Sequence, residues 1–261
     1  MQSIRGLFEA TNQDIDGGHL DRMVRRYRYF DSDCYDNIPK MKYPAEGTQS
    51  FQNDFKEVLR CHNHPSLTTK FLRNSDDSVA EVFEEFCKES GITLIDWGKI
   101  KDIVSDVDSI VLKLKYDNNR PRPLHYLSDM SNDELYIKYK KSPSYPSGHT
   151  TIAYFLCDML SANIPDLQQD LQTLASLIGQ TRIENAVHFP TDIDYGRLVG
   201  ETLANLFLSQ DDNKISFGLK TKNYREFGTR LCDKAQEVYS NDIEIDAYEN
   251  YARDMADFLY R

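Results

Sequence analysis

The chain has 261 residues, a length that fits one large domain or two small ones. Hydrophobic residues make up 40% and charged residues 28%, a composition that excludes an intrinsically disordered protein. The 42 acidic residues outnumber the 31 basic ones and give a formal net charge of −11, which argues against a nucleic-acid polymer as partner.

Residues 1–50 are the least regular part of the chain, and we predict an irregular N-terminal segment there. A basic–aromatic stretch at 22–29 fits a solvated helix face better than a nucleic-acid patch. Residues 31–47 contain two prolines and are predicted to be a loop. The remainder, 51–261, is predicted to form one helical domain.

In this second region apolar residues recur at spacings of three and four, the period of an amphipathic helix. Ile100, Ile103 and Val107, for example, fall on one face of a single predicted helix. The predicted helices span 51–60, 78–90, 97–116, 150–160, 165–187, 192–208, 224–239 and 245–260, with a further helix start at 131–134. Because convincing period-2 alternation is absent, the sequence predicts an all-α protein with a single core.

Three properties of the sequence bear on its compartment. No stretch reaches the roughly 20 apolar residues of a membrane-spanning helix. The N-terminus lacks the apolar segment of a secretory leader. The five cysteines are widely spaced and form no C-x-x-C pair, so we expect free thiols in a reducing compartment. We therefore expect a soluble, cytoplasmic protein with no membrane partner, or a periplasmic or secreted one if a leader was removed.

Three clusters of polar residues lie between positions 113 and 192. The first, from Lys113 to Pro123, places lysines at the end of a predicted helix and then two Arg-Pro pairs. Because proline stops the helix, the arginines lie on a stiff, extended segment. Their guanidinium groups match phosphate oxygens in a bidentate fashion, and lysine adds a point charge. Taken alone, the pattern is more typical of a surface loop.

The second cluster, 143–151, leads directly into a predicted helix. It puts Ser147, Gly148 and His149 at a helix N-terminus, where unpaired N–H groups and the helix dipole favour an anion. The histidine is suited to general acid–base chemistry beside that anion. A capped helix with a surface histidine is the equally good structural alternative.

The third cluster, 181–192, contains Arg182, His188 and Asp192. The histidine and the aspartate are four residues apart across a turn, so the carboxylate can accept a hydrogen bond from one ring nitrogen. That contact would fix the tautomer and leave the other nitrogen free to attack an electrophile. A helix-capping Asp192 with a packing His188 is again the alternative.

Together, the three clusters resemble the signature of the type 2 phosphatidic acid phosphatase superfamily. That signature reads lysine, six residues, Arg-Pro; then Pro-Ser-Gly-His; then Ser-Arg, five residues, His, three residues, Asp. The segment Pro-Ser-Tyr-Pro-Ser-Gly-His-Thr-Thr has the form typical of soluble class A bacterial acid phosphatases. The resemblance covers about 110–205. It implies a single-domain helical bundle of the type that this superfamily shares with the vanadium-dependent haloperoxidases.

The sequence departs from the signature at two points. Thr181 stands where the signature has serine, which keeps the hydroxyl. The first cluster also matches twice, because Lys113 is spaced correctly for Arg120 and Lys115 for Arg122. Class A members tend to read Arg-x-Arg-Pro with the second arginine in the signature. We therefore favour Lys115 and Arg122 and treat the other pair as secondary contacts.

The resemblance implies a role for each matching residue. His188 attacks phosphorus and forms a phosphohistidine, Asp192 orients it, and His149 protonates the leaving oxygen and then activates water. The phosphate oxygens are held by Lys115, Arg122, Ser147, Gly148 and Arg182. No metal ion or other cofactor is expected, since cationic side chains replace the metal.

The favoured function is therefore hydrolysis of small phosphate monoesters. One alternative is a vanadium-dependent haloperoxidase, in which vanadate is the cofactor and not an inhibitor. Another is a non-catalytic phosphate-binding protein.

His125 and Tyr126 are candidate groups at the rim of the pocket. The acidic surface argues against anionic polymers and multiply charged esters, but not against a small anion. Both a monomer and a homo-oligomer are compatible with the sequence.

Overall fold

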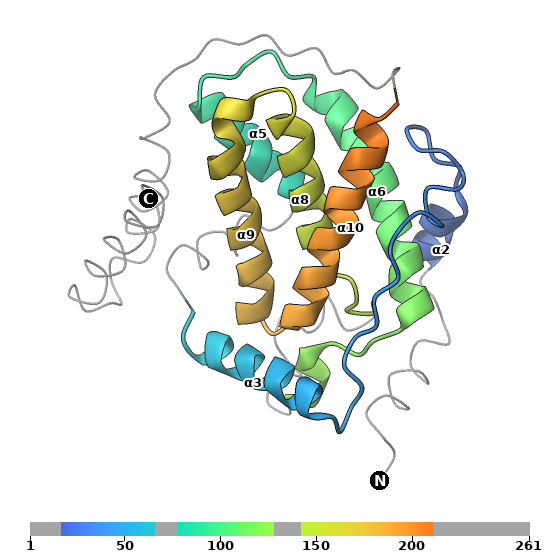
Figure 1. The fold of residues 1–261 in the computed structure, drawn as a ribbon, viewed down its shortest axis with the longest axis vertical. Helices are drawn as coiled ribbons and strands as arrows, with labels where there is room; N and C mark the ends of the chain where they lie inside the picture. The colour runs from blue at the N-terminus through green and yellow to red at the C-terminus, as the bar shows by residue number, and fades with distance from the viewer. Residues whose placement is uncertain (1–16, 66–77, 128–141, 211–261) are drawn as a thin grey trace, which may run out of the picture.

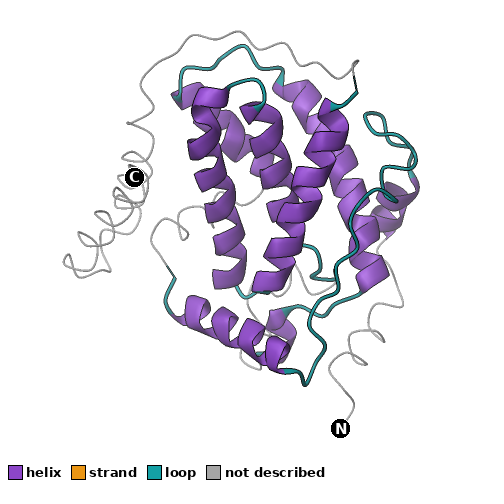
Figure 2. Cartoon of the chain, viewed as in Figure 1, coloured by secondary structure: helices purple, strands orange, loops and turns teal. Residues whose placement is uncertain are grey.

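The computed structural model describes residues 17–65, 78–127 and 142–210. Within these ranges the chain forms seven α-helices, two short 3-10 helices and no strand (Figures 1 and 2). The all-α prediction is confirmed. The helices predicted at 224–239 and 245–260, and the helix start at 131–134, lie outside the described residues.

The helices largely follow the apolar periodicity of the sequence. They are α2 (Gly17–Val24), α3 (Gln49–Asn63), α5 (Val79–Glu89), α6 (Trp97–Asn118), α8 (Gly148–Ser161), α9 (Gln168–Glu184) and α10 (Pro190–Leu208), with 3-10 helices at Pro123–Tyr126 and Pro165–Leu167. The short helix α2 falls within the segment expected to be irregular, whereas 31–47 is loop and turn as predicted. None of the described helices has the length and apolarity needed to cross a bilayer.

Helix α8 lies at the centre of the bundle. Figure 1 shows it between α9 and α10, with α6 alongside and α5 behind, and all four helices contact it. Nine of its 14 residues are buried, because its apolar side chains point in every direction and not along one stripe. The N-terminus of α8, which holds the second polar cluster, is therefore held inside the fold.

The buried apolar side chains form one large cluster and one small cluster. The large cluster fills the space between α5, α6, α8, α9 and α10. The small one comprises Val58, Cys61, Ile183, Ala186 and Phe189. It lies where α3 crosses the ends of α9 and α10 (Figure 1). Helix α3 thus covers the end of the bundle at which the third polar cluster is found.

The described cysteines are free and buried, namely Cys34, Cys61, Cys87 and Cys157. Burial raises the pKa of the Cys87 and Cys157 thiols to about 12, so these thiols stay protonated and unreactive. Their environment is that of apolar filling side chains. Cys232 lies outside the described residues.

Helices α8 and α10 pack closely against each other at Gly200. A Cβ atom there would lie 2.5 Å from the carbonyl oxygen of Thr151 and 3.0 Å from the backbone nitrogen of Phe155. We therefore expect Gly200→Ala to lower the free energy of unfolding by about 1–3 kcal/mol through overpacking, measured by chemical denaturation. Gly98→Ala near the exposed start of α6, where the added Cβ would lie 3.3 Å from the flexible Asp96 carboxylate and not from backbone, is the matched control and is expected to change stability much less. An unchanged stability of Gly200→Ala would contradict the close packing.

Candidate active site

The end of α6 separates the two candidate lysines. Lys113 is exposed, and its Nζ lies 4.1 Å from the centre of the Tyr35 ring. Lys115 is 6% exposed, and its Nζ donates to the carbonyl oxygens of Pro143, Ser144 and Pro146 at 3.0, 3.1 and 2.7 Å. Residues two apart on a helix point to different sides. Only Lys115 therefore faces the second polar cluster.

The Arg-Pro segment separates the two candidate arginines in the same way. Arg122 Nε donates to the Ser142 carbonyl at 2.8 Å. Its Nη1 lies 2.8 Å from the Val187 carbonyl and 3.1 Å from Nε2 of His188. This guanidinium therefore connects the first cluster to the third.

Arg120 points away from Arg122 and is 1% exposed. Its Nη1 donates to Asp192 Oδ1 at 2.6 Å and its Nη2 donates to Asp54 Oδ2 at 2.8 Å. Its guanidinium also lies 3.8 Å from the centre of the Phe189 ring. The two residues expected to make secondary contacts to phosphate thus have other surroundings. Arg120 binds two carboxylates in the interior, and Lys113 lies at the surface.

The second cluster is tied to both of its neighbours through its backbone. The Ser144 N–H donates to the Arg120 carbonyl at 2.8 Å, and the Ser147 N–H donates to the Asp192 carbonyl at 3.0 Å. Ser147 is the N-cap of α8, and its Oγ accepts hydrogen bonds from the backbone N–H and the hydroxyl of Thr150. Gly148 and His149 begin the first turn of α8, whose backbone N–H groups point toward the start of the helix.

The third cluster forms the turn between α9 and α10. Ala186 adopts a left-handed conformation (φ 53°), and the N–H groups of Val187 and His188 then donate to the Arg182 carbonyl. Helix α10 begins at Pro190, a favoured first position. Asp192 caps this helix by accepting from the Phe189 N–H at 2.8 Å.

The contacts of His188 define its tautomer. Its Nδ1 lies 3.2 Å from Asp192 Oδ2 and its Nε2 lies 3.1 Å from Arg122 Nη1. Because arginine only donates, Nε2 is the unprotonated acceptor and Nδ1 carries the hydrogen. The Nε2 lone pair is therefore the acceptor position of this ring.

Burial and positive charge set the protonation of this region. Burial, followed by the charges of Arg122, Lys115, His149 and Arg182, holds the pKa of His188 well below its usual value. Burial and the Arg122 charge likewise lower the pKa of Lys115. Burial disfavours charge of either sign, whereas the surrounding positive charges would stabilise an entering anion. The lowered pKa favours the neutral form of the His188 ring.

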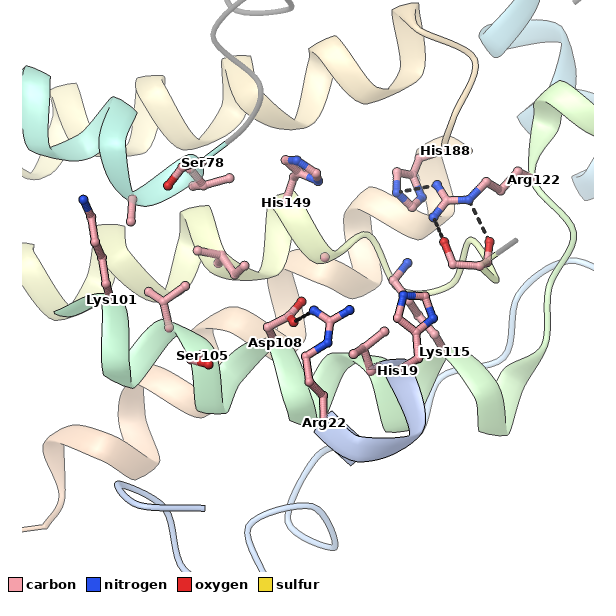
Figure 3. Close-up of a pocket in the computed structure, with 17 residues that line it drawn as sticks. His19, Arg22, Ser78, Lys101, Ser105, Asp108, Lys115, Arg122, His149 and His188 are labelled. Carbon is pink, nitrogen blue, oxygen red and sulfur yellow. Dashed lines mark hydrogen bonds and ion pairs between the residues drawn. The ribbon is translucent and has the colours of Figure 1, made fainter. Parts of the chain in front are cut away.

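These residues open onto a cavity of about 430 Å³. Figure 3 shows His188, Arg122 and Lys115 at one end and Ser78, Lys101 and Ser105 at the other, with His149 between them. The site residues predicted from the sequence that line it are Lys115, Arg122, Gly148, His149 and His188. Asp192, Ser147 and Arg182 lie behind this lining; Arg182 is 1% exposed, and its Nε donates to the Thr181 hydroxyl at 2.9 Å.

The cavity also has lining residues that sequence patterns did not indicate. His19 and Arg22 come from α2, where they contact Tyr116 and Asp108 of α6 at 2.8 and 2.6 Å. The basic character of this stretch was visible in the sequence, but nothing local indicated that it docks beside the signature.

The two rim candidates lie outside the cavity lining. Tyr126 packs among Phe51, Phe55 and Phe189, and the His125 ring stays within hydrogen-bonding distance of the Arg122 backbone. Aromatic packing under α3 explains the position of Tyr126. In the part of the chain that the structure describes, no three or more His, Cys, Asp or Glu residues are grouped so as to hold a metal ion.

Comparison with known proteins agrees with this arrangement. Residues 103–216 match the PAP2 superfamily. Over 185 residues the chain is 31% identical to a non-specific acid phosphatase of Providencia stuartii, a match that covers 66% of this chain and 74% of that relative. The chain belongs to the PAP2 superfamily. The resemblance inferred from the three clusters is confirmed.

Two further relatives of this PAP2 protein match a shorter region. The non-specific acid phosphatases of Salmonella typhimurium and Salmonella typhi are each 39% identical over 61 residues, which is 23% of this chain. The match spans about a quarter of their length, 24%. The PAP2 region includes most of α6 and all of α8, α9 and α10, and thus all three polar clusters, whereas α2 and α3 precede it.

Proposed function

We propose that this PAP2 protein is a phosphatase that hydrolyses small phosphate monoesters through a phosphohistidine intermediate, without a metal ion. The observation that carries the proposal is the environment of His188: an unprotonated Nε2 at the cavity end, oriented by Asp192 and next to the Arg122 guanidinium. Relatives named as non-specific acid phosphatases support the same reaction.

In the first half of the reaction, the phosphate enters the end of the cavity formed by Arg122 and Lys115. Arg122 Nη1 exchanges its hydrogen bond to Nε2 for one to a phosphate oxygen. The Nε2 lone pair then attacks phosphorus, an N–P bond forms, and the P–O ester bond breaks on the opposite side. His149 donates a proton to the departing oxygen, and a neutral alcohol leaves.

In the second half, a water molecule takes the place of the alcohol. His149, now neutral, accepts a proton from this water as the water oxygen attacks phosphorus. The N–P bond breaks and inorganic phosphate leaves with His188 restored. Throughout, Asp192 accepts the hydrogen bond from Nδ1 and stabilises the positive charge of the phosphorylated ring.

The charge that develops on the phosphoryl oxygens is met by fixed cations and N–H groups. Arg122, Lys115 and Arg182 supply the positive charge, and the first turn of α8 supplies backbone N–H donors. We propose that these groups perform the role that a metal ion has in other phosphatases. Activity is accordingly expected to survive treatment with EDTA.

The remainder of the cavity favours an uncharged alcohol. Its apolar lining consists of Val79, Ala80, Val104, Leu112 and Ile152. The cations near it are already paired, Arg22 with Asp108 at 2.6 Å and Lys101 with Glu84 at 3.3 Å. A second anionic group would gain little there, so small monoesters with neutral leaving groups are the proposed substrates.

The experiment that tests this function combines His149→Gln with two substrates, p-nitrophenyl phosphate and an alkyl phosphate, both in the presence of EDTA. The wild type is expected to hydrolyse both. Because an alkoxide needs a proton more than a nitrophenolate does, the variant should lose about 10²–10⁴-fold on the alkyl ester and much less in the first turnover of the aryl ester. Nitrophenol should appear as a burst, followed by slow steady-state release.

The phosphohistidine intermediate should accumulate in the variant during the burst, so it can be detected directly. Protein quenched in alkali after the burst should carry one phosphate on the peptide that contains His188, detected by mass spectrometry. An equal loss of the first-turnover rate on both esters would contradict the acid role of His149. Phosphate binding without turnover by the wild type, or bromide oxidation that requires vanadate and peroxide, would contradict the phosphatase function.

A further inference from the structure

Asp54 is a buried carboxylate on α3 for which the proposed mechanism has no role. Its side chain is 3% exposed. Its Oδ2 accepts from Arg120 Nη2 at 2.8 Å and from the Thr191 hydroxyl at 2.5 Å, and its Oδ1 accepts from the Thr191 N–H at 3.1 Å. Both oxygens are thus used to hold groups that adjoin Asp192.

We propose that Asp54, acting through Arg120, is a positioning residue that fixes Asp192 and thereby orients His188 for attack on phosphorus. The inference rests on the proposed function. It assigns to α3, which precedes the PAP2 region, a part in the chemistry of that region.

The first step of the argument is a continuous chain of contacts. Asp54 and Asp192 bind the two ends of one guanidinium, at 2.8 and 2.6 Å from Arg120 nitrogens. Arg120 occupies Oδ1 of Asp192, which leaves Oδ2 for His188 Nδ1 and the Phe189 N–H. Each oxygen of Asp192 therefore has a fixed direction, and the imidazole has one place to donate its hydrogen.

The second step concerns the backbone that holds Asp192. Thr191 lies in the first turn of α10, and Asp54 accepts hydrogen bonds from both its N–H and its hydroxyl. The same hydroxyl accepts from Arg120 at 2.7 Å. Asp54 thus anchors the helix start and the arginine together, so that rotation of either would break several hydrogen bonds.

The third step is electrostatic. Cations from four segments face His188: Lys115 of α6, Arg122, His149 of α8 and Arg182 of α9; Asp192 of α10 is the carboxylate that contacts it. Phosphorylation adds positive charge to the ring, which Asp192 must stabilise. The Arg120 charge weakens this stabilisation, and the Asp54 charge partly neutralises Arg120. Without the Asp54 charge, Arg120 would attract the Asp192 carboxylate more strongly, and Asp192 would stabilise the positive charge on His188 less.

These steps predict a specific kinetic effect. Asp54 contacts none of Lys115, Arg122 or Arg182, so its loss should leave phosphate binding intact while slowing attack by His188. For Asp54→Asn we expect kcat to fall by about 10–100-fold, the range for residues that orient a reactive histidine from a distance. The competitive inhibition constant of inorganic phosphate should stay within about twofold of that of the wild type.

The matched control is Asp106→Asn. The Asp106 side chain is equally buried, at 3% exposed, and accepts from Arg25 Nη2 at 2.7 Å and from the backbone N–H groups of Arg28 and Tyr29. Its contacts are with the segment after α2 and not with the third cluster. Asp106→Asn should lower the melting temperature as a lost buried ion pair does, but leave kcat unchanged.

Thr191→Val is the second variant and keeps the Asp54–Arg120 ion pair. It removes the hydroxyl that bonds both Asp54 and Arg120, so kcat should fall by about fivefold, with unchanged phosphate inhibition. Thr191→Val still tests the positioning role if Asp54→Asn does not fold. Unchanged kcat in the folded variants, or a rise in the phosphate inhibition constant in step with the loss of kcat, would overturn the positioning role. Absence of activity in the wild type would instead overturn the proposed function.

Discussion

His188→Ala is expected to lower kcat with p-nitrophenyl phosphate by about 10⁴-fold or more, because it removes the group that forms the bond to phosphorus. The ring is 2% exposed and makes two side-chain hydrogen bonds, to Arg122 and Asp192. Steady-state assays with matched circular-dichroism spectra would measure the loss. Added imidazole should restore part of the activity by entering the space that the side chain leaves.

His62→Ala is the control for the loss of a histidine. Its Nδ1 lies 2.8 Å from the Glu184 carbonyl, close to the third cluster in space, but it is absent from the cavity lining. This variant should keep wild-type kcat. If His188→Ala retained more than about a hundredth of the wild-type turnover, His188 would not be the nucleophile.

Asp192→Asn is expected to lower kcat by about 10³–10⁴-fold, as the corresponding change does in other carboxylate–histidine pairs. The carboxylate contacts three donors: Arg120 at Oδ1, and His188 Nδ1 and the Phe189 N–H at Oδ2. An amide has one oxygen. If its NH₂ group faces His188, the ring must carry its hydrogen on Nε2, and the lone pair that attacks phosphorus is lost.

If the amide turns the other way, its NH₂ group faces the Arg120 guanidinium, and a buried arginine loses an acceptor. Both orientations therefore predict lower kcat, and the second also predicts lower thermal stability. Measuring kcat, the phosphate inhibition constant and the melting temperature together separates the two. A loss of kcat below tenfold would contradict the orienting role.

Much of the fold follows from local sequence alone. The helices at α3, α5, α6, α8 and α10 appear where apolar residues recur at helical spacing, and their caps are residues such as Thr48, Ser78 and Ser147. One long helix was predicted at 165–187, whereas α9 ends at Glu184, because Ala186 reverses the chain into the turn that carries His188. Helix α2 is short, and much of its support is contact with α6.

The polar residues of the site were likewise visible as types and spacings, but their partners were not. The four-residue separation of His188 and Asp192 predicted the contact that the structure shows at 3.2 Å. Nothing in the spacing indicated that Asp54, 66 residues before Arg120, would bind the same guanidinium. Such a contact depends on how α3 crosses the bundle, which is decided by the packing of Val58 and Phe189 in the small apolar cluster.

The sequence by itself determined the helical class, the superfamily and the set of ionisable groups, because periodicity and motif spacing are local properties of the chain. Spacing alone allowed two lysine–arginine pairs in the first cluster, and the resemblance favoured Lys115 with Arg122. The tertiary structure separates the two pairs: α6 turns Lys115 toward the loop before α8 and Lys113 toward the surface, and the buried carboxylates bind Arg120. The reason is physical, since a cation is oriented by the acceptors that fold around it, and those come from distant parts of the chain.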